Sequence, residues 1–172
     1  MSKYRKAALA TAIIAVPLIG VNVLPSAAQQ PPPPPPIATE FLTSRAVFTD
    51  DVDAKFKIKR PQEGATVVKS EDASRTLVAR FTVQPGARFP WHSHPGPVIV
   101  NITQGELVYV PADDCSRRPY PAGTAFVDPG HGHVHSAVNR TGQPTIFVAT
   151  FYEAPADGPL LIPAQAPAGC TI

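Results

Sequence analysis

The sequence has few of the residues on which several common classes of protein depend. Only 16% of its 172 residues are charged, and it contains 2 cysteines, 1 methionine and 1 tryptophan. No segment has the apolar periodicity of a long amphipathic helix, which argues against a helical bundle. No candidate nucleophile stands beside a base, and no acid–base pair can be assigned from spacing, so the sequence offers no catalytic site of those kinds.

The two cysteines lie far apart, and neither has a histidine or a second cysteine nearby in the sequence. This isolation counts against a catalytic or metal-binding thiol, which remains the poorer alternative. For a protein of an oxidising compartment we predict a disulfide between Cys115 and Cys170. Closing a loop of that length would stabilise the fold by about 4 kcal/mol.

Residues 1–28 have the pattern of a secretory signal peptide. Three basic residues open the chain, residues 7–24 are almost wholly apolar, and Ser26-Ala27-Ala28 offers a small-residue cleavage site before Gln29. An uncleaved membrane anchor is the alternative, because the apolar run is about long enough to span a bilayer. We expect cleavage, no stable membrane insertion afterwards, and a secreted or periplasmic protein.

The basic character of the chain belongs to this leader. Residues 1–28 carry three positive charges and no negative ones, so their removal lowers the formal net charge from +2 to −1. Nothing in the remaining sequence indicates a nucleic-acid partner.

Proline is abundant, with 22 residues, and glycine contributes 11 more. Residues 31–36 are consecutive prolines, which form a stiff polyproline spacer of about 19 Å, so we interpret residues 29–36 as a proline-rich linker. The length then leaves one domain, residues 37–172. Prolines continue through 153–172 and predict a tail with little regular structure.

Short apolar runs between glycines and prolines predict an all-β sandwich or barrel. The candidate strands are residues 41–48, 52–59, 66–69, 76–83, 98–102, 106–110, 124–127, 134–138 and 145–151. Apolar and charged residues alternate in 52–59, which predicts that one face of this strand packs on the core. Residues 145–151 are apolar on both faces, as in a central strand. We also predict a hairpin between 98–102 and 106–110, with its turn at Gln104-Gly105.

All five histidines fall in two segments. His92 and His94 alternate in the first, and His133 and His135 alternate in the second, where His131 also lies. Alternate side chains of an extended segment share a face, so each pair can point at one spot. Scattered surface histidines would not group in this way, and the pattern indicates a metal site.

Together the two segments resemble the paired motifs of the cupin family. The first family motif is Gly, five residues, His-x-His, three or four residues, Glu, six residues, Gly. The second is Gly, five residues, Pro-x-Gly, two residues, His, three residues, Asn. The matching residues are Gly86, His92, His94 and Gly105 for the first, and Gly123, Pro129, Gly132, His135 and Asn139 for the second, with one extra residue before Gly132. More narrowly, HSHPGPV, DDC and AFVDPGxGHVH resemble small exported bacterial cupins with a terminal cysteine.

The resemblance implies a jelly-roll barrel, a double-stranded β-helix, with one divalent metal held inside by His92, His94 and His135. Three imidazoles suit zinc, iron, manganese, nickel or copper. His133 is either a fourth ligand or, as we favour, a residue that supports a ligand. The resemblance also implies pairing of two copies through their sheets, as a homodimer.

The chain departs from the family at Val98, which occupies the position of the motif's glutamate. Three neutral imidazoles bring no negative charge, so this substitution weakens the attraction for a metal and removes a proton acceptor. We expect His131 to be exposed, Asn139 to bond backbone, Glu106 to be solvated and Trp91 to point away from the metal. The candidate cavity walls are Phe81, Phe89, Tyr109 and Phe126.

These features allow more than one function. A metal with open positions inside a barrel suits a small-molecule oxidoreductase resembling cupin dioxygenases, or an isomerase. The competing hypothesis is a non-catalytic exported protein that binds a metal or a small ligand. A metal-free barrel for sugars or organic acids is the third, because the fold alone does not settle the function.

Overall fold

The computed structural model describes residues 33, 35–60, 64–70 and 73–172, which belong to one compact unit. The predicted signal peptide and most of the predicted linker lie outside the described residues. Within the described ranges, no helix is long and apolar enough to cross a membrane.

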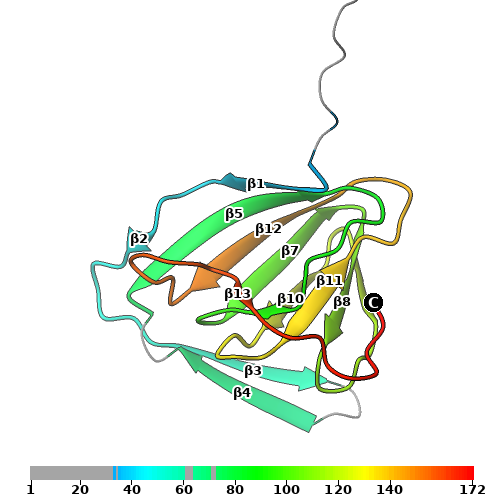
Figure 1. Cartoon of the computed structure of the whole chain (residues 1–172). Helices are drawn as coiled ribbons and strands as arrows, with labels where there is room; N and C mark the ends of the chain where they lie inside the picture. The colour runs from blue at the N-terminus through cyan, green and yellow to red at the C-terminus, as the bar shows by residue number, and fades with distance from the viewer. Residues whose placement is uncertain (1–32, 34, 61–63, 71–72) are drawn as a thin grey trace, which may run out of the picture. The chain divides into compact units, whose positions relative to one another are not determined.

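The described strands pair in an antiparallel manner and form two large sheets (Figure 1). The first sheet has the order β1 (Ile37–Phe41), β5 (Arg75–Val83), β12 (Thr145–Tyr152), β7 (Val98–Gln104) and β10 (Ala125–Asp128), and β2 (Ala46–Val47) also pairs with β5. The second has the order β13 (Ile162–Pro163), β6 (His92–Ser93), β11 (His135–Val138), β8 (Glu106–Pro111) and β9 (Arg118–Pro121). This architecture confirms the predicted all-β cupin fold.

The main core lies between these two sheets. Buried residues alternate with half-buried ones along β12, which sits centrally between β5 and β7 as predicted for residues 145–151. Phe81 of β5 stacks on Phe147 of β12 with ring centroids 4.9 Å apart. Leu107 and Ala137 reach the same core from the second sheet.

The predicted hairpin at Gln104-Gly105 is wrong. A turn is present, with Gly105 at φ 73°, but β7 and β8 belong to different sheets and do not pair with each other. Gly105 packs so closely on Thr145 that an added Cβ would lie 2.9 Å from its hydroxyl oxygen. The tight corner carries the chain from one sheet into the other, so both strands can line the same interior.

The strands β3 (Ala54–Arg60) and β4 (Gly64–Ser70) form a separate two-stranded sheet. Along β3 the expected alternation is present, but its apolar side chains are only half-buried. The predicted core face of this segment is therefore a partly covered face of a ribbon, because the ribbon lies outside both large sheets. Phe56 makes an edge contact with Tyr152, at 5.6 Å between ring centroids.

A second apolar layer covers the outer face of the second sheet. Its buried members are Trp91, Val108, Val110 and Val138. The end of the chain packs against them through Cys170 and Ile172. The tail is nearly free of regular structure, as predicted, apart from the two residues of β13.

Candidate metal centre

Three histidines meet inside the barrel. His92 lies on β6, His94 follows this strand directly, and His135 begins β11, where its Cα pairs with that of His92. The ring centroids are 4.9 Å apart for His92 and His94, 4.3 Å for His92 and His135, and 5.1 Å for His94 and His135. One ring nitrogen from each lies within 4.8 Å of the other two, and all three side chains are buried. The structure thus brings together the three predicted ligands.

Hydrogen bonds hold each ring by its Nδ1. The Nδ1 of His92 lies 2.7 Å from the Pro90 carbonyl, and the Nδ1 of His94 lies 2.8 Å from the Leu160 carbonyl. For His135, Nδ1 is hydrogen-bonded to the His133 carbonyl at 3.3 Å and also lies 3.1 Å from an Asp128 carboxylate oxygen. Since carbonyl and carboxylate oxygens only accept, Nδ1 is the donor in each ring and Nε2 keeps its lone pair. This is the tautomer that ligates a metal through Nε2.

The three rings are neutral near pH 7. Burial lowers the pKa of His92 to about 4, with a further contribution from the neighbouring His94. Burial also lowers the pKa of His135 to about 3, even though Asp128 acts in the opposite direction. The pKa of His94 is lowered by burial as well, against the effects of Asp128 and the Leu160 carbonyl. Neutral imidazole is the form that binds metal, so the donor set fits a divalent ion.

Asp128 is a carboxylate of this site that sequence reasoning missed. Its side chain is 1% exposed, and it accepts a hydrogen bond of 2.6 Å from the Tyr109 hydroxyl and one of 2.9 Å from the Gly130 amide. Burial acts to raise the pKa of Asp128, but the hydrogen bond with His133 and the charges of His135 and His94 outweigh it and lower that pKa. A signal was present in the sequence, because Asp128 follows Phe126 by two residues and so shares the face assigned to a cavity wall.

His133 supports Asp128 and stands apart from the three-histidine group. It precedes β11, with its Nδ1 3.5 Å from Asp128 and its Nε2 3.2 Å from Asp113. The hydrogen bond with Asp128 raises the pKa of His133, burial opposes it, and Asp113 adds to the increase. Both ring nitrogens therefore face oxygen atoms.

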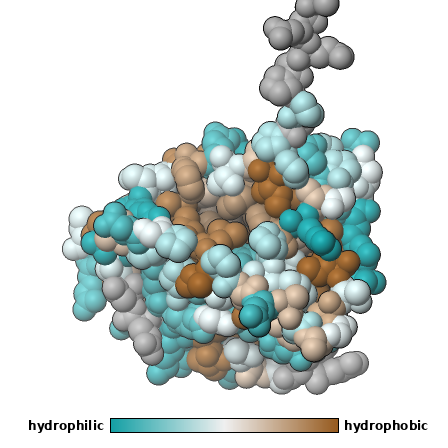
Figure 2. All heavy atoms as spheres, viewed as in Figure 1, coloured by the Kyte–Doolittle hydropathy of each residue, from teal (hydrophilic) through white to brown (hydrophobic). Residues whose placement is uncertain are grey.

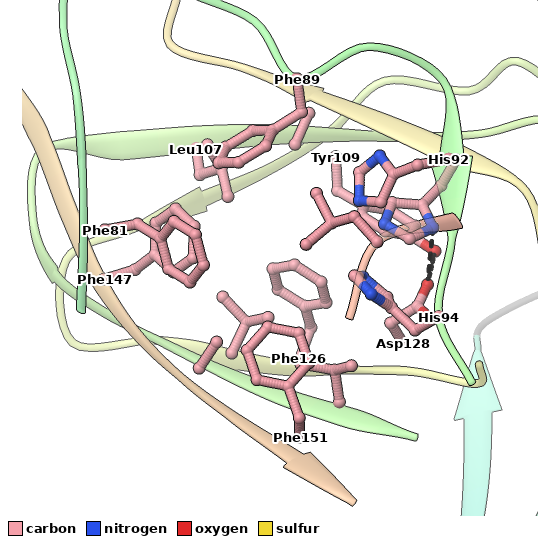
Figure 3. Close-up of a pocket in the computed structure, with 16 residues that line it drawn as sticks. Phe81, Phe89, His92, His94, Leu107, Tyr109, Phe126, Asp128, Phe147 and Phe151 are labelled. Carbon is pink, nitrogen blue, oxygen red and sulfur yellow. Dashed lines mark hydrogen bonds and ion pairs between the residues drawn. The ribbon is translucent and has the colours of Figure 1, made fainter. Parts of the chain in front are cut away.

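The histidines close one side of a largely apolar cavity (Figure 3). Figure 3 shows the rings of His92 and His94 on one side and those of Phe81 and Phe147 facing them across the space. Together with its mouth, the cavity has a volume of about 430 Å³. The four predicted walls are confirmed as lining residues: Phe81, Phe89, Tyr109 and Phe126. Val98 also lines the cavity, in the place of the family's glutamate.

A hollow between β1 and the C-terminal tail adjoins the cavity. Figure 2 shows hydrophobic atoms gathered in this hollow. Its walls include the exposed Phe41 and share Phe81, Phe89 and Leu161 with the cavity. The hollow is therefore the side from which an apolar molecule could approach the histidines.

The remaining predicted residues lie away from the histidine triad. Trp91 packs on the outer apolar layer, as expected for a residue that alternates with the ligands. His131 is exposed and its Nε2 lies 2.7 Å from Glu153. Glu106 is only half-buried. Asn139 is buried and donates to the carbonyls of Val83 and Gln143, which is the backbone role predicted for it.

The tail helps to hold the first histidine segment. Cys115 and Cys170 form a disulfide with their Cα atoms 5.4 Å apart. Upstream of this link, β13 pairs with β6, and the Leu160 carbonyl reaches His94. A disulfide is typical of proteins from oxidising, extracytoplasmic compartments.

Among solved structures, similarity extends over parts of several proteins. Oxalate oxidase in complex with the substrate analogue glycolate is 26% identical, with 45% of this chain and 41% of that chain covered and a TM-score of 0.41. The polyketide cyclase RemF from Streptomyces resistomycificus is 23% identical, with 54% and 64% covered and a TM-score of 0.44. KdgF from Halomonas sp. is 16% identical, with 71% and 84% covered and a TM-score of 0.47. The match thus spans about two fifths of the length of oxalate oxidase.

No curated protein matches this sequence significantly. The sequence pattern of the family described as "Cupin domain" matches residues 79–151. That segment contains both histidine motifs, the second half of β5, the strands from β6 to β11, and β12 except its last residue. Residues 79–151 therefore match a cupin domain.

Proposed function

We propose that this protein is an exported cupin that holds one divalent metal ion through His92, His94 and His135. The observation that carries the proposal is the shared orientation of the three rings. Each Nδ1 is bonded to an oxygen acceptor, which leaves three Nε2 lone pairs within one buried group. Imidazole nitrogens held in this way suit zinc, iron, manganese, nickel or copper.

Three protein ligands leave positions open for a small molecule. A divalent metal supplies Lewis-acid chemistry at such a site, and a redox-active one also supplies oxygen chemistry. The chain's own contribution is a dry chamber: the aromatic walls exclude water and orient an apolar group beside the histidines. The function that fits best is a dioxygenase-like small-molecule oxidoreductase.

One observation favours a second candidate, a non-catalytic exported protein that binds a metal or a small ligand. Among the described residues that line the cavity, Asp128 is the only carboxylate. It already accepts from Tyr109 and from the Gly130 amide, and it contacts His135. The site therefore offers no carboxylate base that is free for substrate.

Export is the part of the proposal that rests on the sequence of residues 1–28. The disulfide between Cys115 and Cys170 supports it, because such bonds persist mainly outside the cytoplasm. A small-molecule ligand remains the partner that the cavity favours, and pairing of two copies is a further expectation from the family.

Elemental analysis of the purified exported protein tests the metal site. We expect close to one equivalent of metal, and its loss in His92→Ala and in His135→Ala. His131→Ala is the matched control, because this histidine is exposed and lies outside the three-histidine group. Metal-free wild-type protein that also fails to take up any of the five metals would contradict the proposal.

Oxygen consumption separates the two candidate functions once the metal is established. Protein loaded with iron, copper, nickel or manganese is offered phenols, diketones and thiols. Turnover that disappears in His135→Ala supports the oxidoreductase. Silence with every metal, together with ligand binding, supports the binding protein.

A further inference from the structure

Val98 and Asp128 face each other across neighbouring strands. Their Cα atoms are partners in the antiparallel pair of β7 and β10. Each side chain is 1% exposed, and both line the cavity that holds the histidines. Directly opposed residues of an antiparallel pair lie on the same face, with Cβ atoms about 5 Å apart. Asp128 thus brings a carboxylate into the cavity from β10, directly opposite Val98 of β7, which has no carboxylate.

The contacts of Asp128 connect it to one histidine. Its Oδ2 lies 3.1 Å from the Nδ1 of His135, which is the nitrogen remote from the lone pair that could ligate a metal. The same Nδ1 is also hydrogen-bonded to the His133 carbonyl at 3.3 Å. The Tyr109 hydroxyl and the Gly130 amide donate to the same carboxylate and fix its orientation. A carboxylate that accepts from a ligating imidazole orients the ring and raises its basicity.

The other two histidines have no such partner. The Nδ1 atoms of His92 and His94 are bonded to backbone carbonyls, of Pro90 and Leu160 respectively. Asp128 groups with His133 and His135, and not with His92 and His94. Its route to a metal therefore runs through the His135 ring.

We propose that Asp128 provides the negative charge of the metal centre from across the strand pair, acting through His135 in place of a carboxylate at position 98. This inference rests on the proposed metal site and assigns Asp128 as a positioning residue. It also explains how a three-histidine set with a valine at position 98 can keep a useful affinity for a divalent cation, since the carboxylate compensates part of the ion's charge.

Metal affinity of the full chain is the first test, measured for Zn²⁺ and Co²⁺ by competition with a chromophoric chelator. Asp128→Asn keeps the shape and removes the charge, so we expect affinity to fall by about 10- to 100-fold. Thr145→Val is the matched control, because it removes a partly buried hydrogen bond to the Glu106 carbonyl away from the cavity. Its folded form should bind metal with wild-type affinity.

Moving the carboxylate across the pair is the sharper test. Val98→Glu combined with Asp128→Asn should recover most of the lost affinity, whereas Val98→Gln with Asp128→Asn should not. The two double variants have side chains of nearly equal size, so a difference between them reports charge at position 98. Equal affinities in the two double variants, or wild-type affinity in Asp128→Asn, would overturn the proposal.

Two spectroscopic measurements distinguish the outcomes. In the Co²⁺ form, Asp128→Asn should keep the coordination number of wild type, and a lost ligand would contradict the route through His135. In the metal-free protein, nitrogen NMR should find His135 with its proton on Nδ1, and Asp128→Ala should weaken that preference. If wild-type protein binds no metal, the proposed function fails, and the NMR result alone supports or overturns the link between Asp128 and His135.

Discussion

The hydrogen bond that each histidine makes through Nδ1 decides whether its Nε2 keeps the lone pair that a metal needs. His92 and His94 donate their Nδ1 protons to backbone carbonyls, which no substitution of a distant side chain removes. His135 is hydrogen-bonded to the His133 carbonyl and, in addition, its Nδ1 lies 3.1 Å from the side chain of Asp128. At the scale of single residues, the centre thus contains two rings held by the main chain alone and one ring that a carboxylate side chain also contacts.

Acid should destabilise the metal-free protein through these rings. The folded-state pKa values of His92 and His135, about 4 and about 3, lie below the ordinary 6.5, so the unfolded chain binds more protons across that interval. The free energy of unfolding should therefore decrease as pH falls from about 6.5 to about 4. Since one pKa unit corresponds to about 1.4 kcal/mol, His92 alone accounts for a loss on the order of 3 kcal/mol.

Urea unfolding of the metal-free protein between pH 7 and pH 4 measures this effect. His92→Leu should flatten the curve, because it removes one of the groups that must be charged. The raised pKa of His133 has the opposite effect on stability, because protonation of His133 favours the folded state at low pH. The wild-type curve contains both effects, so the contribution of His92 is obtained by comparing variants. Thr145→Val, which changes no titratable group, should be less stable and keep the wild-type slope. An unchanged slope in His92→Leu would refute the assignment.

The strand that carries the first histidine is one of the shortest elements of the fold. β6 has two residues, and it is held between β11 on one side and β13 on the other. The Ala164 amide adds a hydrogen bond of 3.0 Å to the Trp91 carbonyl. A strand this short has too few residues to show its own alternation, so the sequence could not predict it. Its position depends on the tail, which the disulfide fastens.

Removing the disulfide should therefore loosen this element. In the double variant Cys115→Ser with Cys170→Ser, the free energy of unfolding should fall by about 4 kcal/mol, because the bond spans a sequence separation of 55 residues. Metal affinity should fall as well, since the Leu160 carbonyl that orients His94 belongs to the released tail. Urea unfolding and chelator competition measure the two effects.

Wild-type protein reduced with a dithiol and freed of metal is the comparison for stability. It should unfold at the same urea concentration as the double serine variant, which shows that the bond and not the substitution is responsible. Wild-type stability in both samples would mean that the apolar contacts of Cys170 and Ile172 hold the tail without the disulfide.

Over the described residues, the sequence predicted most of the features that depend on local sequence pattern. Spacing indicated two histidine pairs, and the resemblance to the cupin motifs then implied His92, His94 and His135, the group that the structure brings together. The pairing of strands is not determined by local pattern, because β7 pairs with β12 and β10 while β8 lies in the other sheet. Asp128 escaped notice because its role depends on the register that sets it opposite Val98.

Metal should link the site to the stability of the whole domain. An ion that binds only the folded state raises the free energy of unfolding by RT ln(1 + [L]/Kd), which is about 2.7 kcal/mol at a free concentration of one hundred times Kd. For a domain of this size, each kcal/mol corresponds to roughly 2–4 °C in melting temperature. Calorimetry should therefore show a rise of about 5–10 °C on loading the chelator-treated protein. His135→Ala should show no rise and His131→Ala should show the wild-type rise, while an equal rise in His135→Ala would place the ion elsewhere on the chain.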